Sequence, residues 1–477
     1  MSPNISPTVA VIGGGISGAT AALHLAELGL NITLIEKNKG LVSGPPICHL
    51  HAGGNLYREI SVSQCIELLK QSIDSVRLFP HTINQRPTII AVPHTDGGDP
   101  NHLLERLDQI KSCYAQLVER DPRNKVIGEP EDYYRLIFRE ELDELATRAQ
   151  PSNPQTIDDW LIPFAKHTDL DGLKYPVVAV QEYGWSVFRI AATTSLALEA
   201  LPNCTLLTES KLLSMTEKGD KWELTYSDRE MNTHSFVVDY VINACGYETG
   251  NVDDMAKLPR RRMVEFKAAY VTQWQQSDEK WPEVIFHGPR GSVDGMAQLT
   301  PYVDGTFQLH GMTKDITLFD DGLVSSCQES SQPKLPQRLI NKINNGWREH
   351  ERLTRSERAI RHMSRFIPDY ATATEYGVPL FGAQQIPGDD ETLRAADVTF
   401  SGHHYARIEV VKGSSAYEAV RKVVSHWGLF DYKNHTIEEL HPKSQSMSAQ
   451  QVECKACQLA TERGYPVSLA KYYGSEI

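Results

Sequence analysis

The N-terminal segment is a short apolar run, a cluster of glycines and then a stretch of apolar and small residues. This pattern predicts a buried strand over Thr8–Ile12, a helix over Ala19–Leu28 and a second buried strand over Asn31–Ile35. Strands joined through a helix in this way pair in parallel. The sequence therefore predicts that an α/β unit opens the chain.

Later segments alternate between helical and strand patterns. A helix is expected over 61–80, a charged helical insertion over about 100–150, and a buried strand that ends in a glycine turn at Gly246. Alternating, aromatic-rich segments over 262–313, with a possible hairpin at Asp304-Gly305, predict a largely antiparallel sheet. A long charged helix is expected over Gln337–His362, and the chain ends in a polar extension.

Composition narrows the class of protein. The chain has 477 residues with 40% hydrophobic content, which is enough for two or three domains. A net charge of -13 argues against a general affinity for nucleic acid. Eight scattered cysteines and the lack of a signal-like or 20-residue apolar run indicate a cytoplasmic protein with no transmembrane segment; peripheral membrane contact is left open.

The glycine cluster satisfies G-x-G-x-x-G between the first strand and the helix, through Gly13, Gly15 and Gly18. Glycines at these places allow a tight turn, close approach of backbone to a pyrophosphate and close packing of the helix on the strand. Glu36 stands at the end of the second strand, where an acid can accept hydrogen bonds from a ribose hydroxyl and would repel a 2'-phosphate. The motif predicts a dinucleotide site but does not separate FAD from NAD.

Further segments resemble the family of FAD-dependent oxidoreductases typified by D-amino acid oxidase and glycine oxidase. The resemblance lies first in His51-Ala52-Gly53-Gly54-Asn55-Leu56, which is also similar to a loop of 2-hydroxyglutarate dehydrogenases. The other segments are Gly184-Trp185-Ser186-Val187-Phe188-Arg189-Ile190-Ala191, Val241-Ile242-Asn243-Ala244-Cys245-Gly246 and Phe400-Ser401-Gly402-His403. In that family glycines usually follow the last pair, whereas this chain has His404, Tyr405, Ala406 and Arg407. The resemblance implies FAD as the cofactor.

The resemblance also implies the domain plan. It is a Rossmann-like, discontinuous FAD-binding domain of the glutathione-reductase type, interleaved with a substrate domain that is mainly an antiparallel β-sheet. The expected FAD-binding domain comprises residues 1–90, 177–255 and 366–425. The expected substrate domain comprises residues 91–176 and 256–365, and residues 426–477 form a C-terminal extension.

The expected site has a cofactor set and a catalytic set. The cofactor set is Gly13, Gly15, Ile16, Ser17, Gly18, Glu36, Lys37, His51, Ala52, Gly53, Gly54, Ala244, Cys245, Gly246, Gly402, His403, His404, Tyr405, Ala406 and Arg407. The catalytic set, which would supply a base and a cationic clamp for a carboxylate, is His49, His51, Tyr57, Arg58, His403 and Arg407. No metal site is expected.

Several residues keep more than one interpretation. Cys48, His49 and His51 could attach the flavin covalently, bind a metal or serve as loop residues with structural hydrogen bonds. The Lys412-Gly413-Ser414-Ser415 segment could place N–H groups against the flavin or simply start a helix. The basic run Arg260-Arg261-Arg262 could be solvated or contact substrate, and Cys454 with Cys457 is interpreted as structural.

Together these features predict an oxidoreductase that transfers a hydride from a small amine, amino acid or 2-hydroxy acid to flavin N5. The partners would be the small-molecule substrate and an electron acceptor, oxygen or a quinone. Two alternatives are kept: a FAD-binding partner or maturation protein without turnover, and a FAD-dependent monooxygenase. Flavin reduction by small acids distinguishes the first hypothesis from both alternatives.

Overall fold

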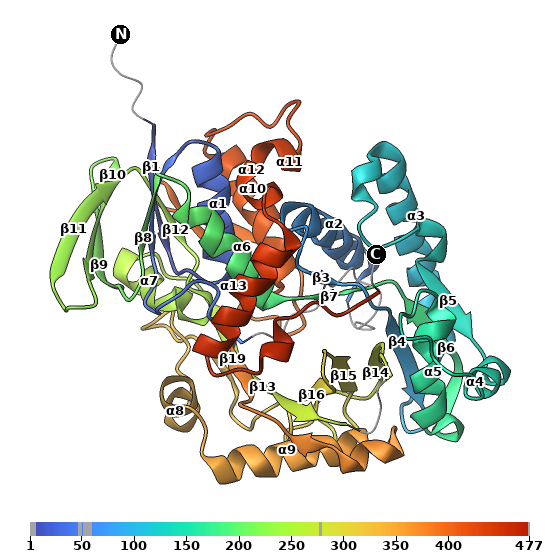
Figure 1. The fold of residues 1–477 in the computed structure, drawn as a ribbon. Helices are drawn as coiled ribbons and strands as arrows, with labels where there is room; N and C mark the ends of the chain where they lie inside the picture. The colour runs from blue at the N-terminus through green and yellow to red at the C-terminus, as the bar shows by residue number, and fades with distance from the viewer. Residues whose placement is uncertain (1–5, 46–49, 51–59, 276–278, 476–477) are drawn as a thin grey trace.

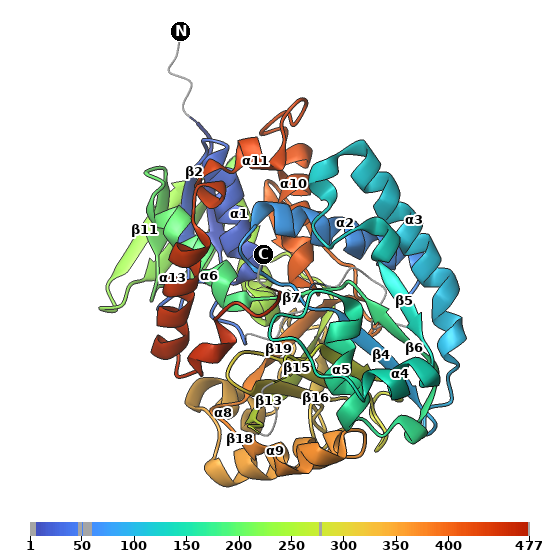
Figure 2. The same cartoon turned by 45° about the vertical axis from the view of Figure 1, so that its right-hand side comes forward.

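The structure, a computed structural model, describes residues 6–45, 50, 60–275 and 279–475. Within them the chain forms a parallel sheet, a small antiparallel meander and a large, mostly antiparallel sheet (Figure 1). Figure 2 shows the large sheet below the parallel one, with helices on the outside of both. The predicted class, a Rossmann-like domain with an interleaved antiparallel sheet, is confirmed.

The parallel sheet contains the predicted βαβ unit at its centre. Its strands lie in the order β20 (Val398–Ser401), β21 (Tyr405–Ile408), β12 (Tyr240–Asn243), β1 (Thr8–Ile12), β2 (Asn31–Ile35) and β8 (Cys204–Leu207). The neighbouring strands pair in parallel, apart from β20 and β21, which form a hairpin. The carboxyl ends of β2, β1, β12 and β21 therefore meet at one edge, which is where ligands bind in open α/β sheets.

Different layers cover the two faces of the parallel sheet. One face carries α1 (Ile16–Glu27), α6 (Val187–Glu199), α10 (Ala416–His426) and α13 (Ala449–Glu462). The other carries the meander of β9 (Lys211–Lys218), β10 (Lys221–Ser227) and β11 (Thr233–Val238), with α7 (Thr249–Ala256). Trp222 of β10 is fully enclosed between the meander and the sheet. The strands of this sheet are apolar on both faces because both are covered.

The large sheet forms most of the second domain. Its order is β17 (Leu323–Ser325), β13 (Arg262–Gln273), β16 (Thr306–Gly311), β15 (Ala297–Pro301), β14 (Glu283–Phe286), β4 (Thr88–Pro93), β6 (Leu173–Val180) and β5 (Tyr134–Ile137), with β18 (Thr374–Glu375) and β19 (Leu380–Pro387) also paired to β13. Neighbouring strands of this sheet pair antiparallel, except for β14 and β4, which pair in parallel. The hairpin predicted at Asp304-Gly305 joins β15 to β16, and both of its turn residues have positive φ, 59° and 64°.

The remaining elements surround these sheets. They are α2 (Val62–Leu78), the β3 and β7 pair (Ile83–Asn84 and Gly184–Trp185), α3 (Leu104–Arg120), α4 (Arg139–Leu145), α5 (Ile157–His167), α8 (Gln337–Asn345), α9 (Glu349–Met363), α11 (Ile437–Leu440) and α12 (Pro442–Gln445). The single helix expected over Gln337–His362 is therefore two helices. The chain breaks at Gly346, whose φ of 78° is incompatible with a continued right-handed helix.

Strand pairing also divides the chain differently from the expected boundaries. Residues 374–387 were expected in the FAD-binding domain, but β18 and β19 pair with β13 of the large sheet. At its C-terminal end the chain returns to the cofactor side, where α13 packs against α6. Sheet membership is decided by pairing over long sequence separations, which local patterns do not report.

Candidate functional site

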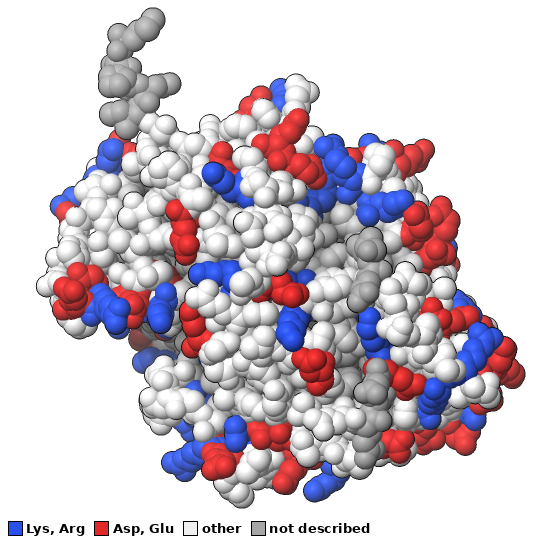
Figure 3. Space-filling model, in the orientation of Figure 1, with Lys and Arg blue, Asp and Glu red and all other residues white. Residues whose placement is uncertain are grey.

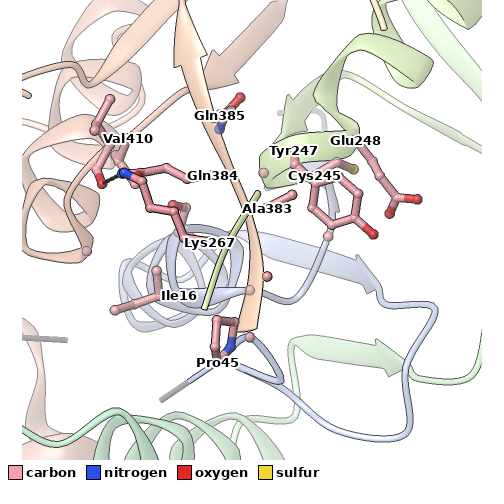
Figure 4. A pocket seen from close by; sticks show the side chains of 18 of the residues that line it. Ile16, Pro45, Cys245, Tyr247, Glu248, Lys267, Ala383, Gln384, Gln385 and Val410 are labelled. Atoms are coloured by element: carbon pink, nitrogen blue, oxygen red, sulfur yellow. Dashed lines mark hydrogen bonds between the residues drawn. The ribbon is translucent and has the colours of Figure 1, made fainter. Parts of the chain in front are cut away.

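A cavity of about 1630 Å³ lies between the carboxyl edge of the parallel sheet and the large sheet. Small-molecule pockets are usually about 300–1,000 Å³, so this one has room for an extended dinucleotide and a substrate together. Figure 4 shows β19 crossing the cavity, with Lys267 and Gln384 on one side and Cys245, Tyr247 and Glu248 on the other. The cofactor residues of the sequence prediction that line it are Gly13, Gly15, Ile16, Ser17, Glu36, Lys37, Ala244, Cys245 and Gly246.

The glycines of the fingerprint meet different surroundings. Gly13 has φ +95°, and a Cβ added there would stand 2.6 Å from the carbonyl oxygen of Ala244. A Cβ at Gly18 would stand 1.7 Å from the carbonyl oxygen of Gly13, so the helix can approach the turn only without one. A Cβ at Gly15 would meet nothing within 4 Å. Gly13 and Gly18 are therefore required by packing, whereas the space beside Gly15 is open to a ligand.

Helix α1 begins directly at this open space. Its N-cap is Gly15, which has no side chain to accept from the first N–H groups, and the first turn contains no acidic residue. The first N–H groups of a helix have no partner within it, and the positive end of the helix dipole lies there. This arrangement suits the phosphates of a dinucleotide.

Glu36 occupies the carboxyl end of β2 beside the glycine turn. Its carboxylate accepts hydrogen bonds from Gly14 N at 2.6 Å and Asn38 N at 2.7 Å. Burial raises the pKa of Glu36, although both backbone N–H groups act against that rise. The next residue, Lys37, forms an ion pair with Glu248. A buried acid held in this way can accept from a ribose hydroxyl without moving.

The end of β12 forms another part of the cavity wall. Gly13 lies against Ala244, and the Cys245 thiol donates to the carbonyl oxygen of Ile12 with a sulfur-to-oxygen distance of 3.3 Å. Burial raises the pKa of Cys245 well above that of a free thiol, so the group is neutral and unreactive at neutral pH. Cys245 is therefore a packing residue of the wall.

The opposite wall carries two cations that share one carboxylate. Lys267 of β13 lies 2.8 Å from a Glu265 carboxylate oxygen and donates to Gln384 Oε1 at 3.1 Å, and Arg290 pairs with Glu265 as well. Burial lowers the pKa of Lys267 to about 8, although Glu265 opposes this. Sequence reasoning missed this group. Its signal was an acid and a lysine two residues apart in an otherwise apolar strand, which places both on one face.

The turn at Gly402 joins β20 to β21 at the edge of the parallel sheet opposite to the carboxyl edge that forms the cavity. β21 runs parallel to β12 with Tyr405 beside Val241 and Arg407 beside Asn243, so the turn that precedes β21 is remote from the carboxyl edge. There the Trp222 indole donates to His403 O at 2.8 Å, and the His404 ring stacks on the Tyr240 ring with 4.2 Å between the ring centroids. The part of this segment that lines the cavity is residues 410–413, after the strand.

Arg407 is enclosed in a buried charge network under the cavity wall. Its guanidinium donates to Asp253 Oδ1 at 2.6 Å, Ser401 Oγ at 2.6 Å and Leu258 O at 2.7 Å. The Tyr405 hydroxyl and Arg262 also bind Asp253. These contacts hold Arg407 and Arg262 in the protein interior, away from any substrate. Arg407 therefore stabilises this buried network, in contrast to the catalytic role expected from the sequence.

The chain matches a model of the family of FAD dependent oxidoreductases over residues 8–388. The chain belongs to this family. Solved structures with a similar fold include glycerol-3-phosphate dehydrogenase from Bacillus halodurans complexed with FAD, at 15% identity and a TM-score of 0.56, covering 100% of this chain and 77% of that chain. Another is L-amino acid deaminase from Proteus vulgaris, at 12% identity and a TM-score of 0.56, covering 95% of this chain and 97% of that chain. Glycine oxidase from Geobacillus kaustophilus has 12% identity and a TM-score of 0.53, covering 90% of this chain and 100% of that chain.

At such identities the likeness to these structures shows the fold alone. A search of the curated proteins found no match. The family nevertheless establishes FAD as the cofactor, in agreement with the prediction. The geometry of this FAD-dependent oxidoreductase fits that cofactor, with open space at Gly15, unpaired N–H groups at α1 and a buried acid at Glu36.

Other predicted site residues of the flavoprotein lie outside the described residues. They are Cys48, His49, His51, Ala52, Gly53, Gly54, Tyr57 and Arg58. The described residues on either side, Pro45 and Ile60, both line the cavity. Lys412 and Gly413 line it too, while Ser414 and Ser415 lead into α10 and contact α2 through Ser75 and Gln71.

Cys454 and Cys457 lie on α13 as free thiols. Among the described residues there is no group of His, Cys, Asp or Glu that could hold a metal ion, and none of the helices there is long and apolar enough to cross a membrane. Figure 3 shows acidic and basic side chains interspersed over one face of the molecule.

Proposed function

We propose that this FAD-dependent oxidoreductase oxidises a small amine, amino acid or 2-hydroxy acid that carries a carboxylate. The observation that supports the proposal is that Lys267 and Arg290 line the cavity and share the buried carboxylate of Glu265. Two cations share one anion, so the group has an excess positive charge when Lys267 is protonated. A carboxylate in the cavity would complete the charge balance in a partly desolvated place, where ion pairs are stronger than at the surface.

Bound FAD supplies the acceptor, N5, for the hydride of the substrate carbon. The protein's own groups bind and orient the substrate. Lys267 and Arg290 would hold the carboxylate. The Gln384 amide would keep the lysine in place, because it accepts a hydrogen bond from Lys267 and donates one to Val411 O at 2.7 Å. Placing the substrate in this way lowers the barrier by proximity, without any obligatory acid or base for a neutral amine.

A hydroxy acid needs a base to accept its hydroxyl proton. His287, which follows β14, and His310 of β16 line the same cavity, and an imidazole can accept a proton near neutral pH. His49, His51, Tyr57 and Arg58 stay proposals for the base and clamp, supported by the position of their neighbours Pro45 and Ile60 in the cavity wall. Reoxidation by oxygen or a quinone is likewise proposed.

Anaerobic titration of the purified yellow protein tests this function. Panels of amino acids, secondary amines and 2-hydroxy acids are added without oxygen, and the visible absorbance of the flavin is followed. Bleaching by a member of the acid panels is expected. Bleaching by no small acid, with tight binding to another protein, would show a binding partner without turnover, and rapid reduction by NADPH would show a monooxygenase; either result overturns the proposal.

A further inference from the structure

The C-terminal extension lies against the cofactor domain. Helix α13 packs along α6, which lies next to α1 on one face of the parallel sheet (Figure 1, Figure 2). The extension, residues 426–477, lies beyond residue 388, where the match to the family ends. We infer that Arg463, at the C-terminal end of α13, is a positioning residue of the FAD site, which it shapes through Leu41 and Val42.

Arg463 makes a two-pronged contact with the backbone that follows β2. Its Nη2 donates to Leu41 O at 2.7 Å and its Nη1 donates to Val42 O at 2.8 Å. The guanidinium also lies over the Phe188 ring, 5.7 Å from the centroid. The planar fork of an arginine suits two adjacent carbonyl oxygens, which an ammonium group cannot bind in the same geometry. The side chain is thus anchored between α6 and the Leu41-Val42 backbone.

The Val42 backbone has a conformation that needs such support. Its φ is 51°, in the left-handed region that β-branched residues avoid, and its side chain is buried. Its N–H donates to Gly14 O at 2.7 Å, and its carbonyl oxygen is the acceptor for Arg463. The strained residue is therefore held from both sides, by the glycine turn and by the extension.

Leu41 connects the same contact to the fingerprint. A Cβ added at Gly14 would stand 2.8 Å from Leu41 Cδ2, so the leucine lies directly over the glycine turn. The Gly14 N–H in turn donates to Glu36. After Val42 the chain continues into residues 43–45, which line the cavity. Release of the Leu41-Val42 backbone would let this wall and the Gly14-Glu36 contact relax together.

Two substitutions on the same helix test the inference. Arg463→Ala removes both hydrogen bonds. Lys455→Ala is the matched control, because it removes a cation of α13 that makes no hydrogen bond or ion pair with the described residues. The dissociation constant of FAD is measured by titrating each apoprotein and following flavin fluorescence. We expect a rise of about tenfold or more for Arg463→Ala and about twofold or less for Lys455→Ala. Equal FAD affinity in the two variants would overturn the inference.

A double-mutant cycle separates positioning from general stability. Val42→Gly removes the backbone strain because glycine adopts positive φ readily. Arg463→Ala should therefore raise the FAD dissociation constant less in the Val42→Gly background than in the wild type, and an equal rise in both would contradict the inference. If Arg463→Ala is insoluble, Arg463→Lys decides, with a rise of about threefold or more expected because one carbonyl contact is lost; no rise would overturn the inference.

Discussion

The two walls of the cavity are built in different ways. The cofactor wall consists of backbone groups and one acid that lie close together in sequence, from Gly13 to Glu36, with the end of β12 beside them. The opposite wall, which we propose binds the substrate and call the substrate wall, consists of side chains such as Lys267, Arg290 and Gln384, which come from separate strands and loops of the large sheet. Local sequence therefore specifies the proposed FAD site, and strand pairing specifies the side chains proposed to bind a substrate beside it.

The largest effect is expected from the packing glycine of the cofactor wall. In Gly18→Ala the new Cβ would stand 1.7 Å from Gly13 O, a backbone atom that cannot move without opening the βαβ turn. We expect the free energy of unfolding of the apoprotein to fall by about 3 kcal/mol or more. Urea unfolding measures this, and an unchanged midpoint would show that the turn is not closed as described.

Gly15→Ala is the matched substitution at the ligand side of the same turn. Its Cβ would meet no atom of the described protein within 4 Å, so the apoprotein should unfold within about 0.5 kcal/mol of wild type. The methyl group would occupy the space beside the α1 N–H groups, so FAD should bind about 100-fold more weakly. Fluorescence titration measures the affinity. Unchanged FAD affinity would mean that the phosphates lie elsewhere.

The substrate wall is tested at Lys267. Lys267→Met should lower kcat/KM for an acid substrate by about 10- to 100-fold, because one of two cations is lost, and leave the FAD affinity unchanged. Lys314→Met, at an exposed lysine, is the control. Steady-state kinetics with the best acid of the panel measures the change. An equal fall of kcat/KM in both variants, or loss of FAD from Lys267→Met, would show that Lys267 does not act as a substrate-binding residue separate from the FAD site.

The pH dependence follows from the same lysine. Because burial lowers the pKa of Lys267 to about 8, its cation is lost as the pH rises through that value. The kcat/KM for an acid substrate should therefore fall above about pH 8 in the wild type. In Lys267→Arg the guanidinium stays protonated, and this decline should move to higher pH. A decline at the same pH in both proteins would assign it to another group.

The smallest effect concerns the cysteines. Burial raises the pKa of Cys65 to about 11 and of Cys204 to about 12, and it also raises the pKa of Cys245 well above that of a free thiol. At pH 7.5, among the cysteines of the described residues, iodoacetamide should modify the exposed Cys327 and Cys454 first, with a change in activity below about twofold. Peptide mass spectrometry measures the order of labelling. Early labelling of Cys245 would show that the cofactor wall is open.

The comparison also explains what the sequence could predict. Gly13, Gly15, Gly18 and Glu36 were recognisable because turn, helix start and strand end are local features. The sequence pattern does not reveal strand β21, so the turn at His403 is expected at the flavin. The parallel pairing of β21 with β12 shows that the carboxyl end of β21 faces the cavity and that the turn lies at its other end. Such pairing is not encoded in a short apolar run.

Other site features depend on contacts even more distant in sequence. Lys267 and Arg290 become neighbours only through their shared Glu265. Arg463 reaches Val42 across 421 positions of the chain, a contact for which no local pattern exists. The break at Gly346, by contrast, carried a local signal, a glycine within a helical pattern.

The most direct test of the account compares a substrate acid with its own amide. Under anaerobic conditions the rate of flavin bleaching is measured for the best acid of the panel and for the amide, which has the same reacting carbon but no charge. If FAD lies at the glycine turn and the substrate is held by Lys267 and Arg290, the acid should reduce the flavin at least about 100-fold faster at limiting concentration. Equal rates for the acid and the amide would contradict the proposed substrate wall.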